Sequence, residues 1–172
     1  MATEPAPFVD GIELRRSSAA DDDLIRRVLS LASDWRNEQP GPLASDVNPA
    51  YYADWGRPDD LGMLAFEGPW FAGGAYARRV GPADGTYGYF ESDLWELTIG
   101  IEPERRGGGL GRLLLESLKA LSLERGVGGL SLSVELDNAP ARRLYEAANF
   151  SIVEERETDV LMAWRLARRG EA

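Results

Sequence analysis

The chain has 172 residues, of which 44% are hydrophobic and 28% charged, and its formal net charge at pH 7 is −10. These values suit one globular domain, and no run of about 18 apolar residues suggests a membrane span. The chain contains neither cysteine nor histidine, which excludes disulfides, thiolate metal sites, a cysteine nucleophile and a Ser-His-Asp triad. We expect no metal, and the acidic charge disfavours a nucleic acid partner.

The negative charge is unevenly distributed along the chain. Residues 1–93 hold 16 Asp and Glu against 8 Lys and Arg, a net charge of −8, whereas residues 94–172 carry a net charge of −2. Surface acidity for solubility explains this count, and so does a first half that receives a cationic partner. Both interpretations stay open.

The first residues show no basic region followed by an apolar region, so no signal peptide is expected. We expect residues 1–10 to form a disordered lead and residues 11–172 to form a single cytoplasmic domain. Its oligomeric state is left open, a homodimer included.

Hydrophobic periodicity predicts alternating strands and helices, with clusters of Gly and Pro at the breaks between them. The order β-α-α-β-β-β-α-β-α-β-β indicates an α/β (α+β) fold with a partly parallel sheet and helices on its faces. The predicted elements are a strand that ends in a helix start at 11–18, a helix at 24–35, a loop at 37–50, a short helix near 50–55, two strands within 61–80, a glycine-rich loop or hairpin at 81–93, a strand at 94–101, a helix that ends near 125, a strand at 130–136, a helix at 139–149, and closing strands at 150–156 and 159–166.

The stretch RRGGGLGRLL at 105–114 opens a helix with four glycines, although each costs a helix about 1 kcal/mol relative to alanine. Unpaired N–H groups at a helix N-terminus form an anion site, and glycine lets a large anion approach the backbone. The stretch therefore predicts a bound phosphate or pyrophosphate. It fits the dinucleotide fingerprint loosely and lacks the Lys-Ser/Thr of a P-loop. A glycine-rich turn without a ligand remains the alternative.

Two motifs resemble those of the GNAT N-acetyltransferase superfamily. The spacing Arg106-x-x-Gly109-x-Gly111 is similar to its acetyl-CoA pyrophosphate signature. A second signature, 32 residues downstream of Arg106, is matched by Asn138, Ala141, Tyr145 and Phe150. Asn149 stands where the family usually has Gly, but Asn tolerates the left-handed conformation of a helix end. The resemblance is specific over about 94–155 and is a match of element order alone over 1–93.

The resemblance implies the GNAT fold, a mixed central sheet of six to seven strands that is splayed between strands four and five. It also implies direct transfer of an acetyl group from acetyl-CoA, the co-substrate, to a primary amine. Residues 94–155 would form the acetyl-CoA-binding half, and residues 11–93 would form the acceptor side. Strand-four backbone would bind the pantetheine arm, loop amides the pyrophosphate, and Asn138 the cofactor. The expected cofactor-binding residues are Ile99, Gly100, Ile101, Arg106, Gly107, Gly108, Gly109, Leu110, Gly111, Arg112, Asn138 and Tyr145.

The resemblance also implies catalytic roles. Tyr145 would lie near the sulfur and act as general acid. Without histidine the base must be a carboxylate or water, with Glu96 the first candidate and Glu135 the second. Weaker candidates for acceptor contacts are Trp35, Tyr87 and Tyr89, and the uneven charge favours a cationic acceptor.

Two other classes of protein remain at this point. A GNAT-fold sensor would bind acyl-CoA without catalysis, although the presence of Asn138 and Tyr145 favours an enzyme. A Rossmann-like nucleotide binder would need an acidic residue about 20 positions beyond the glycines. Residues 126–129 (GVGG) lie near that place instead.

Overall fold

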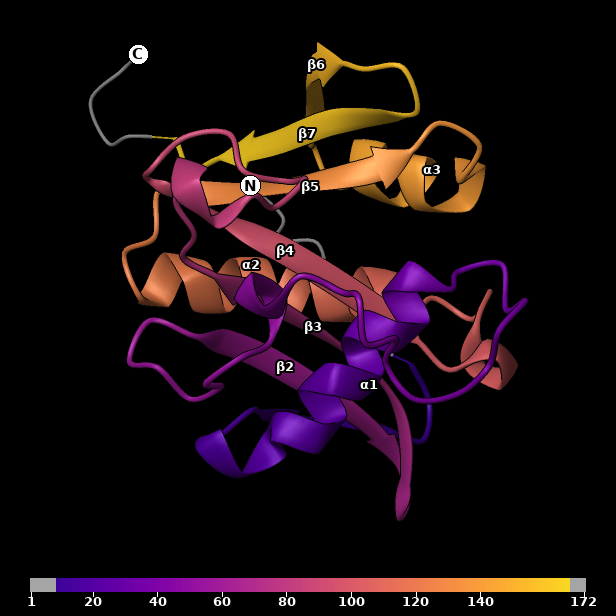
Figure 1. Cartoon of the computed structure of the whole chain (residues 1–172). Helices are drawn as coiled ribbons and strands as arrows, with labels where there is room; N and C mark the ends of the chain where they lie inside the picture. The colour runs from indigo at the N-terminus through magenta and orange to yellow at the C-terminus, as the bar shows by residue number, and fades with distance from the viewer. Residues whose placement is uncertain (1–8, 168–172) are drawn as a thin grey trace, which may run out of the picture.

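The computed structural model describes residues 9–167, and these form a seven-stranded sheet with helices on both faces (Figure 1). The strand order is β1-β2-β3-β4-β5-β7-β6, and every neighbouring pair is antiparallel except the parallel pair β4–β5. The predicted fold class is confirmed, and this topology is not the doubly wound parallel sheet of a Rossmann-like binder. The strands and helices are β1 (Ile12–Arg16), α1 (Asp22–Ser33), β2 (Leu61–Glu67), β3 (Trp70–Arg78), β4 (Leu94–Ile101), α2 (Leu110–Glu124), β5 (Gly129–Glu135), α3 (Ala139–Ala147), β6 (Ser151–Glu155) and β7 (Asp159–Arg165).

The helices divide between the two faces of the sheet. In Figure 1, α1 crosses in front of β3 and β4, and α2 runs behind the sheet across β2 to β5. The larger apolar core lies on the α2 side and includes Tyr145 and Phe150 from α3 and the residues after it. A smaller core on the α1 side contains Ile25, Val28 and Tyr76. Both faces of β4 are therefore covered.

The parallel pair β4–β5 separates after three residue pairs. Leu94, Trp95 and Glu96 pair with residues 129–131, whereas β4 stays in an unshifted register with β3 as far as Ile101. Figure 1 shows the two strands diverging beyond this point. The predicted splay between the fourth and fifth strands is confirmed.

In the first half, one predicted helix has a different form and the expected lead lies mostly outside the described residues. The short helix expected near 50–55 is a single 3-10 turn at Pro49–Tyr51, where the Asn48 side chain accepts the Ala50 N–H at 3.0 Å. The segment does not continue as an α-helix, because Asp54 adopts a left-handed conformation with a φ of +54°. Residues 1–8 of the expected lead lie outside the described residues, while the N–H of Ile12 donates to Val9 O.

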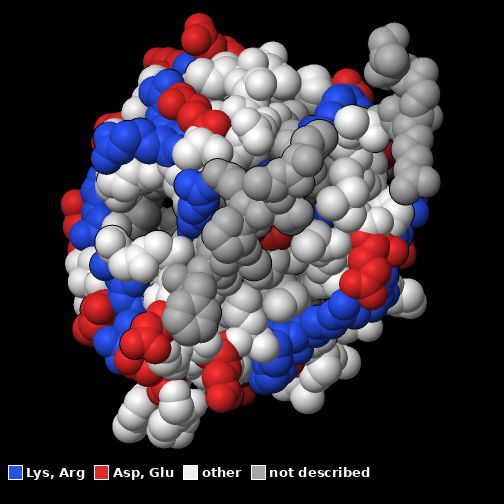
Figure 2. All heavy atoms as spheres, turned by 180° about the vertical axis from the view of Figure 1, so that it is seen from behind, with Lys and Arg blue, Asp and Glu red and all other residues white. Residues whose placement is uncertain are grey.

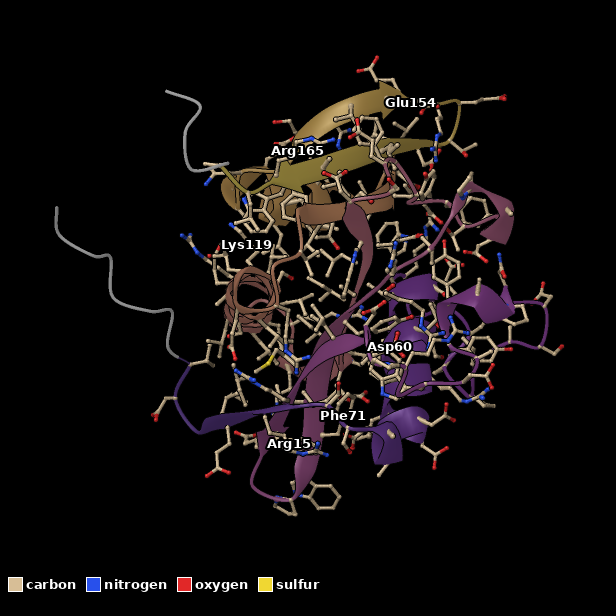
Figure 3. All side chains as sticks on the ribbon, turned by 90° about the vertical axis from the view of Figure 1, so that its left-hand side faces the viewer. Arg15, Asp60, Phe71, Lys119, Glu154 and Arg165 are labelled. Carbon is tan, nitrogen blue, oxygen red and sulfur yellow. The ribbon has the colours of Figure 1, made fainter. Side chains whose placement is uncertain are left out.

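A buried ion pair fixes the segment that follows this turn. The guanidinium of Arg78 and the carboxylate of Asp60 make two hydrogen bonds, of 2.9 and 2.8 Å, and their side chains are 2% and 3% exposed. Arg78 also donates to Ala53 O at 2.7 Å. In Figure 3, Asp60 lies on the α1 side of the sheet, and Lys119 lies on the α2 side.

We expect Asp60→Ala to lower the free energy of unfolding by about 3–5 kcal/mol, because the Arg78 charge would stay buried without its partner. Thermal unfolding followed by circular dichroism measures this loss. Asp59→Ala is the matched control: Asp59 pairs with Arg79 at the surface at 3.8 Å, and an exposed pair contributes at most about 1 kcal/mol. Equal melting temperatures for the two variants would contradict the prediction.

Candidate active site

The opening between β4 and β5 exposes one side of the β4 backbone. The N–H of Glu102 donates to Ala72 O, so the Ala72–Glu102 pair is hydrogen-bonded. Hydrogen-bonded pairs alternate along an antiparallel ladder, which turns the polar groups of Gly100 toward β3 and those of Ile99 and Ile101 toward the opening. Ile99 therefore presents its N–H and C=O groups, and Ile101 its N–H, to the opening, where an extended chain could continue the pairing of β4.

Gly100 has a different role from its two neighbours. Its backbone pairs with β3, and a Cβ placed on it would lie 2.2 Å from Val28 O in α1. The expected contact between Gly100 and the pantetheine arm is thus not the reason for a glycine at this position. The missing side chain lets α1 pack against β4.

The glycines of the loop before α2 fall into three kinds. Gly107 and Gly109 have φ values of +80° and +88°, which side chains rarely adopt. Gly111 is tightly packed, because a Cβ there would lie 3.2 Å from both Ile101 Cδ1 and Leu144 Cδ2. Gly108 has no such φ, and a Cβ on it would meet nothing within 4 Å. Among these four glycines, Gly108 is therefore the one whose presence neither backbone conformation nor packing explains.

The N-terminus of α2 lacks a side-chain cap. Gly109 is the N-cap residue, and the first intrahelical bond is from the N–H of Leu113 to Gly109 O. Within residues 9–167, the N–H groups of Leu110, Gly111 and Arg112 thus have no hydrogen-bond acceptor, and the helix dipole favours an anion there. The Arg112 side chain is exposed and forms no ion pair in the same range.

Arg106 is exposed, but its guanidinium donates hydrogen bonds to two backbone carbonyls beside the opening. Its Nε donates to Ile101 O at 3.1 Å, and its Nη1 donates to Trp35 O at 2.9 Å. Arg106 therefore ties the end of α1 to the end of β4. Trp35, expected as a weak acceptor contact, lies at this junction.

The second motif starts α3. The Asn138 side-chain oxygen accepts the Ala141 N–H at 3.3 Å, which leaves its amide N–H groups available for a ligand. Tyr145 is buried against Phe150, and its hydroxyl has no hydrogen-bond partner among the described residues. Burial raises the pKa of Tyr145 well above its ordinary value, so the phenol keeps its proton at neutral pH. Asn149 has a φ of +67°, the left-handed conformation expected of it.

Glu96 lies on the α1 face of the sheet, at the last pair before the strands separate. Its side chain faces the same way as Arg78 in the paired strand, and the residue is 4% exposed. Oε1 accepts the Gly88 N–H at 2.8 Å, while Oε2 has no partner among the described residues. Burial raises the pKa of Glu96, partly opposed by the Thr86 and Tyr51 hydroxyls that face it. A carboxylate of raised pKa is suited to act as a base near neutral pH.

Glu135, the second candidate for the base, is engaged elsewhere. It is half-exposed, and its Oε2 accepts the Trp35 indole N–H at 2.9 Å and contacts Arg36 Nη1 at 3.1 Å. Arg36 also pairs with Asp137 and stacks on the Trp35 ring. Trp35 and Arg36 thus bridge from the glycine loop to the end of β5. Sequence reasoning missed Arg36; an arginine beside a tryptophan just after a helix was the available signal.

The two other weak acceptor candidates lie in the loop between β3 and β4. Tyr87 is largely exposed, and its backbone N–H donates to the Tyr51 hydroxyl at 2.8 Å, whereas Tyr89 is half-buried. Tyr51, which sequence reasoning also missed, connects this loop with Glu96. No periodicity marks a tyrosine inside a proline-rich segment.

The surface seen from behind shows mixed charge (Figure 2). Acidic and basic side chains are interspersed on this face, which is hollowed at the left of the view, the side on which α3 lies. No group of three or more acidic side chains suited to a metal ion occurs within residues 9–167. None of the described helices combines the length and apolar character needed to cross a bilayer.

Comparison with known proteins agrees with this geometry. The model of the acetyltransferase (GNAT) family matches residues 28–150. A mycothiol acetyltransferase from Actinosynnema mirum is 32% identical over 149 residues, 86% of this chain and 47% of that protein. The chain spans about half the length of the curated relatives it matches.

Two solved structures have a similar fold. One is yncA from Salmonella typhimurium, named as a proposed acetyltransferase and solved with its cofactor acetyl-CoA. It has a TM-score of 0.69 and 18% identity, covering 94% of this chain and 97% of that one. The other is PaiA N-acetyltransferase from Thermoplasma acidophilum in complex with coenzyme A. It has a TM-score of 0.66 and 17% identity, covering 90% and 99%.

We expect Glu96→Gln to stabilise the protein at pH 8. Because burial raises the pKa of Glu96, the folded state retains a proton that the unfolded state has lost above the ordinary pKa of Glu. Stability therefore falls as the pH rises through that interval. Gln removes the buried charge and keeps an oxygen for Gly88. Removing the buried charge should raise the free energy of unfolding by about 1 kcal/mol, which corresponds to a gain of about 2–4 °C in melting temperature.

The measurement is thermal unfolding of wild type and Glu96→Gln from pH 4 to pH 8. The gain should shrink toward pH 4, where both states of the wild type are protonated. Glu135→Gln is the exposed control and should show no pH-dependent gain. A Glu96→Gln protein that is less stable than the wild type at pH 8 would contradict the prediction.

Proposed function

Because the chain belongs to the acetyltransferase (GNAT) family, we propose that it transfers an acetyl group from acetyl-CoA directly to a primary amine. The observation that carries the proposal is the opening between β4 and β5, with an uncapped, glycine-rich helix start at its mouth. The acetyl-CoA and coenzyme A bound in yncA and PaiA agree with this choice of co-substrate.

The residues around the opening suit acetyl-CoA. The unpaired polar groups of Ile99 and the N–H of Ile101 match an extended chain of amides such as pantetheine. The free N–H groups at the start of α2 suit a pyrophosphate, and Gly108 leaves room for it. Asn138 has amide donors left for the cofactor.

Bound acetyl-CoA supplies an activated thioester, so the protein has to manage two protons. Glu96 takes a proton from the acceptor ammonium, because only a neutral amine can attack. Tyr145 holds the proton that the departing thiolate needs, because a phenol is protonated at neutral pH. Glu96 belongs to the α1 face and Tyr145 to the α2 face. The amine would therefore enter from the α1 side and meet the thioester in the opening.

The charge of the first half of the chain favours a cationic acceptor. Residues 1–93 carry a net charge of −8, and Glu96 is a buried carboxylate with a free oxygen. A cleft lined with negative charge raises the local concentration of cations. We propose a primary amine that is protonated in solution as the acceptor class.

We expect Gly108→Val to weaken acetyl-CoA binding at least about tenfold, which is about 1.4 kcal/mol. The new side chain would occupy the space through which the pyrophosphate approaches the amides. The fold should be preserved, since nothing lies within 4 Å of a Cβ at this position. Isothermal titration calorimetry measures the affinity.

Gly41→Val is the matched control for this variant. Gly41 lies in the loop after α1 and also has open space where a Cβ would lie, so both variants should melt near the wild-type temperature. Replacing Gly109 or Gly111 would be a poorer test, because one has a positive φ and the other is tightly packed. Unchanged affinity in Gly108→Val would remove the loop as the cofactor site.

We expect Tyr145→Phe to lower turnover by about 10²-fold with little change in acetyl-CoA affinity, because only the proton donor is lost. Release of coenzyme A thiol is followed with a panel of polyamines, amino sugars, amino acids and peptides with free N-termini, together with the acceptor of the named relatives. Cationic amines should react fastest.

Each outcome of the panel has a distinct meaning. Acetyl-CoA binding without turnover on any amine would favour a sensor over an enzyme. Wild-type turnover in Tyr145→Phe would refute the role of Tyr145 as acid. A preference for anionic acceptors would refute the cationic class.

A further inference from the structure

Hydrogen-bonding capacity is left unfilled beside Glu96. Two buried oxygens have no partner among the described residues, Glu96 Oε2 and Thr86 Oγ1. Gly88 packs beside Glu96. Its N–H donates to Glu96 Oε1, and its carbonyl accepts the Ser131 hydroxyl at 2.7 Å. Burying a polar atom without a hydrogen-bond partner lowers the stability of the fold by about 1–3 kcal/mol. A function that these two oxygens serve would therefore explain why the fold tolerates this loss.

The Tyr51 hydroxyl is the group that connects this sealed carboxylate with the outside. Tyr51 is half-buried, whereas Glu96 is 4% exposed. Its oxygen accepts the Tyr87 N–H at 2.8 Å, so the hydroxyl hydrogen is left to point elsewhere. Within residues 9–167 it has no acceptor of ordinary geometry, and the carboxylate it faces is Glu96.

Two buried polar side chains of β3 hold Tyr51 in this place. The Tyr76 hydroxyl donates to Tyr51 O at 2.9 Å. Arg78, which forms the buried ion pair with Asp60, donates to Ala50 O at 3.3 Å and to Ala53 O at 2.7 Å. The turn that carries Tyr51 is therefore fixed to the sheet on both sides of that residue. Such positioning is what a group that moves protons requires.

We propose that Tyr51 relays the proton from the acceptor amine to Glu96. As the ammonium N–H bond breaks, its proton passes to the Tyr51 oxygen, and the Tyr51 O–H proton passes to Glu96 Oε2. One O–H bond is exchanged and one is formed, so Tyr51 stays neutral throughout. The relay rests on the proposed function and explains how a sealed carboxylate can serve as its base.

The surroundings of Glu96 suit such a relay. From β3 it is faced by Tyr76 and Arg78, and the Arg78 charge is already neutralised by Asp60. Arg156, in the turn between β6 and β7, attracts the Glu96 carboxylate electrostatically, but Arg156 is itself paired with Asp159 at 3.2 Å. The hydroxyls of Tyr51 and Thr86 face it as well. No unpaired cation in the described structure contacts the carboxylate in place of the substrate.

The test is the pH profile of kcat/KM for Tyr51→Phe with a cationic amine. We expect at least about a tenfold loss at pH 7 that shrinks toward pH 10, where the amine loses its proton without help. The KM for acetyl-CoA should be unchanged. Tyr52→Phe is the matched control, since Tyr52 adjoins the same turn but its ring stacks on Arg26.

The outcomes separate the relay from the activity itself. A wild type that acetylates no amine would overturn the proposed function. An active wild type with an unaltered Tyr51→Phe profile, or with a loss equal at every pH, would overturn the relay alone. If Tyr51→Phe fails to fold, the wild-type rate in mixtures of H₂O and D₂O decides. Two protons in flight give a curved dependence on deuterium fraction, and a straight line would overturn the relay.

Discussion

The separation of β4 from β5 after the Glu96–Ser131 pair is the constraint on which the rest of the molecule depends. In a continuous sheet the polar groups of Ile99 would pair with β5, and buried backbone groups need such partners. Here they face an opening instead. The edge keeps its shape because both flanks are fixed: α1 contacts β4 closely at Gly100, and α2 packs tightly beside Leu144 at Gly111.

A second consequence of the opening is the polar character of the α1 face. Tyr76, Arg78 and Glu96 are buried there, where apolar side chains would give more stability. Two of them hold the 49–53 segment by hydrogen bonds to its carbonyls, and the third fixes Gly88. Loops that approach the opening are thus anchored to the sheet as well as to each other. Loss of stability in favour of a rigid site is common in enzymes.

The sequence predicts the two halves of the site unequally. The β4 bounds, the glycine loop and the α3 segment follow from local signals, which are alternation, glycine spacing and helical periodicity. Periodicity cannot show that a helix covers the polar face of β4, so the burial of Glu96 was not predictable. Nor could spacing separate Gly108, where the fold does not need a glycine, from Gly111, which is tightly packed. These facts depend on contacts between segments far apart in the chain.

The two halves of the site also differ in what builds them, which is backbone on one side and side chains on the other. The proposed cofactor side is formed largely by backbone groups, whose positions depend on the fold and on a few glycines. The proposed acceptor side is formed by side chains on loops that long-range contacts hold in place, such as Arg106 to Trp35 and Tyr87 to Tyr51. Side chains in those loops can change without disturbing the β4 edge. A protein of this construction can therefore keep one co-substrate while its acceptor varies, because different parts of the chain determine each.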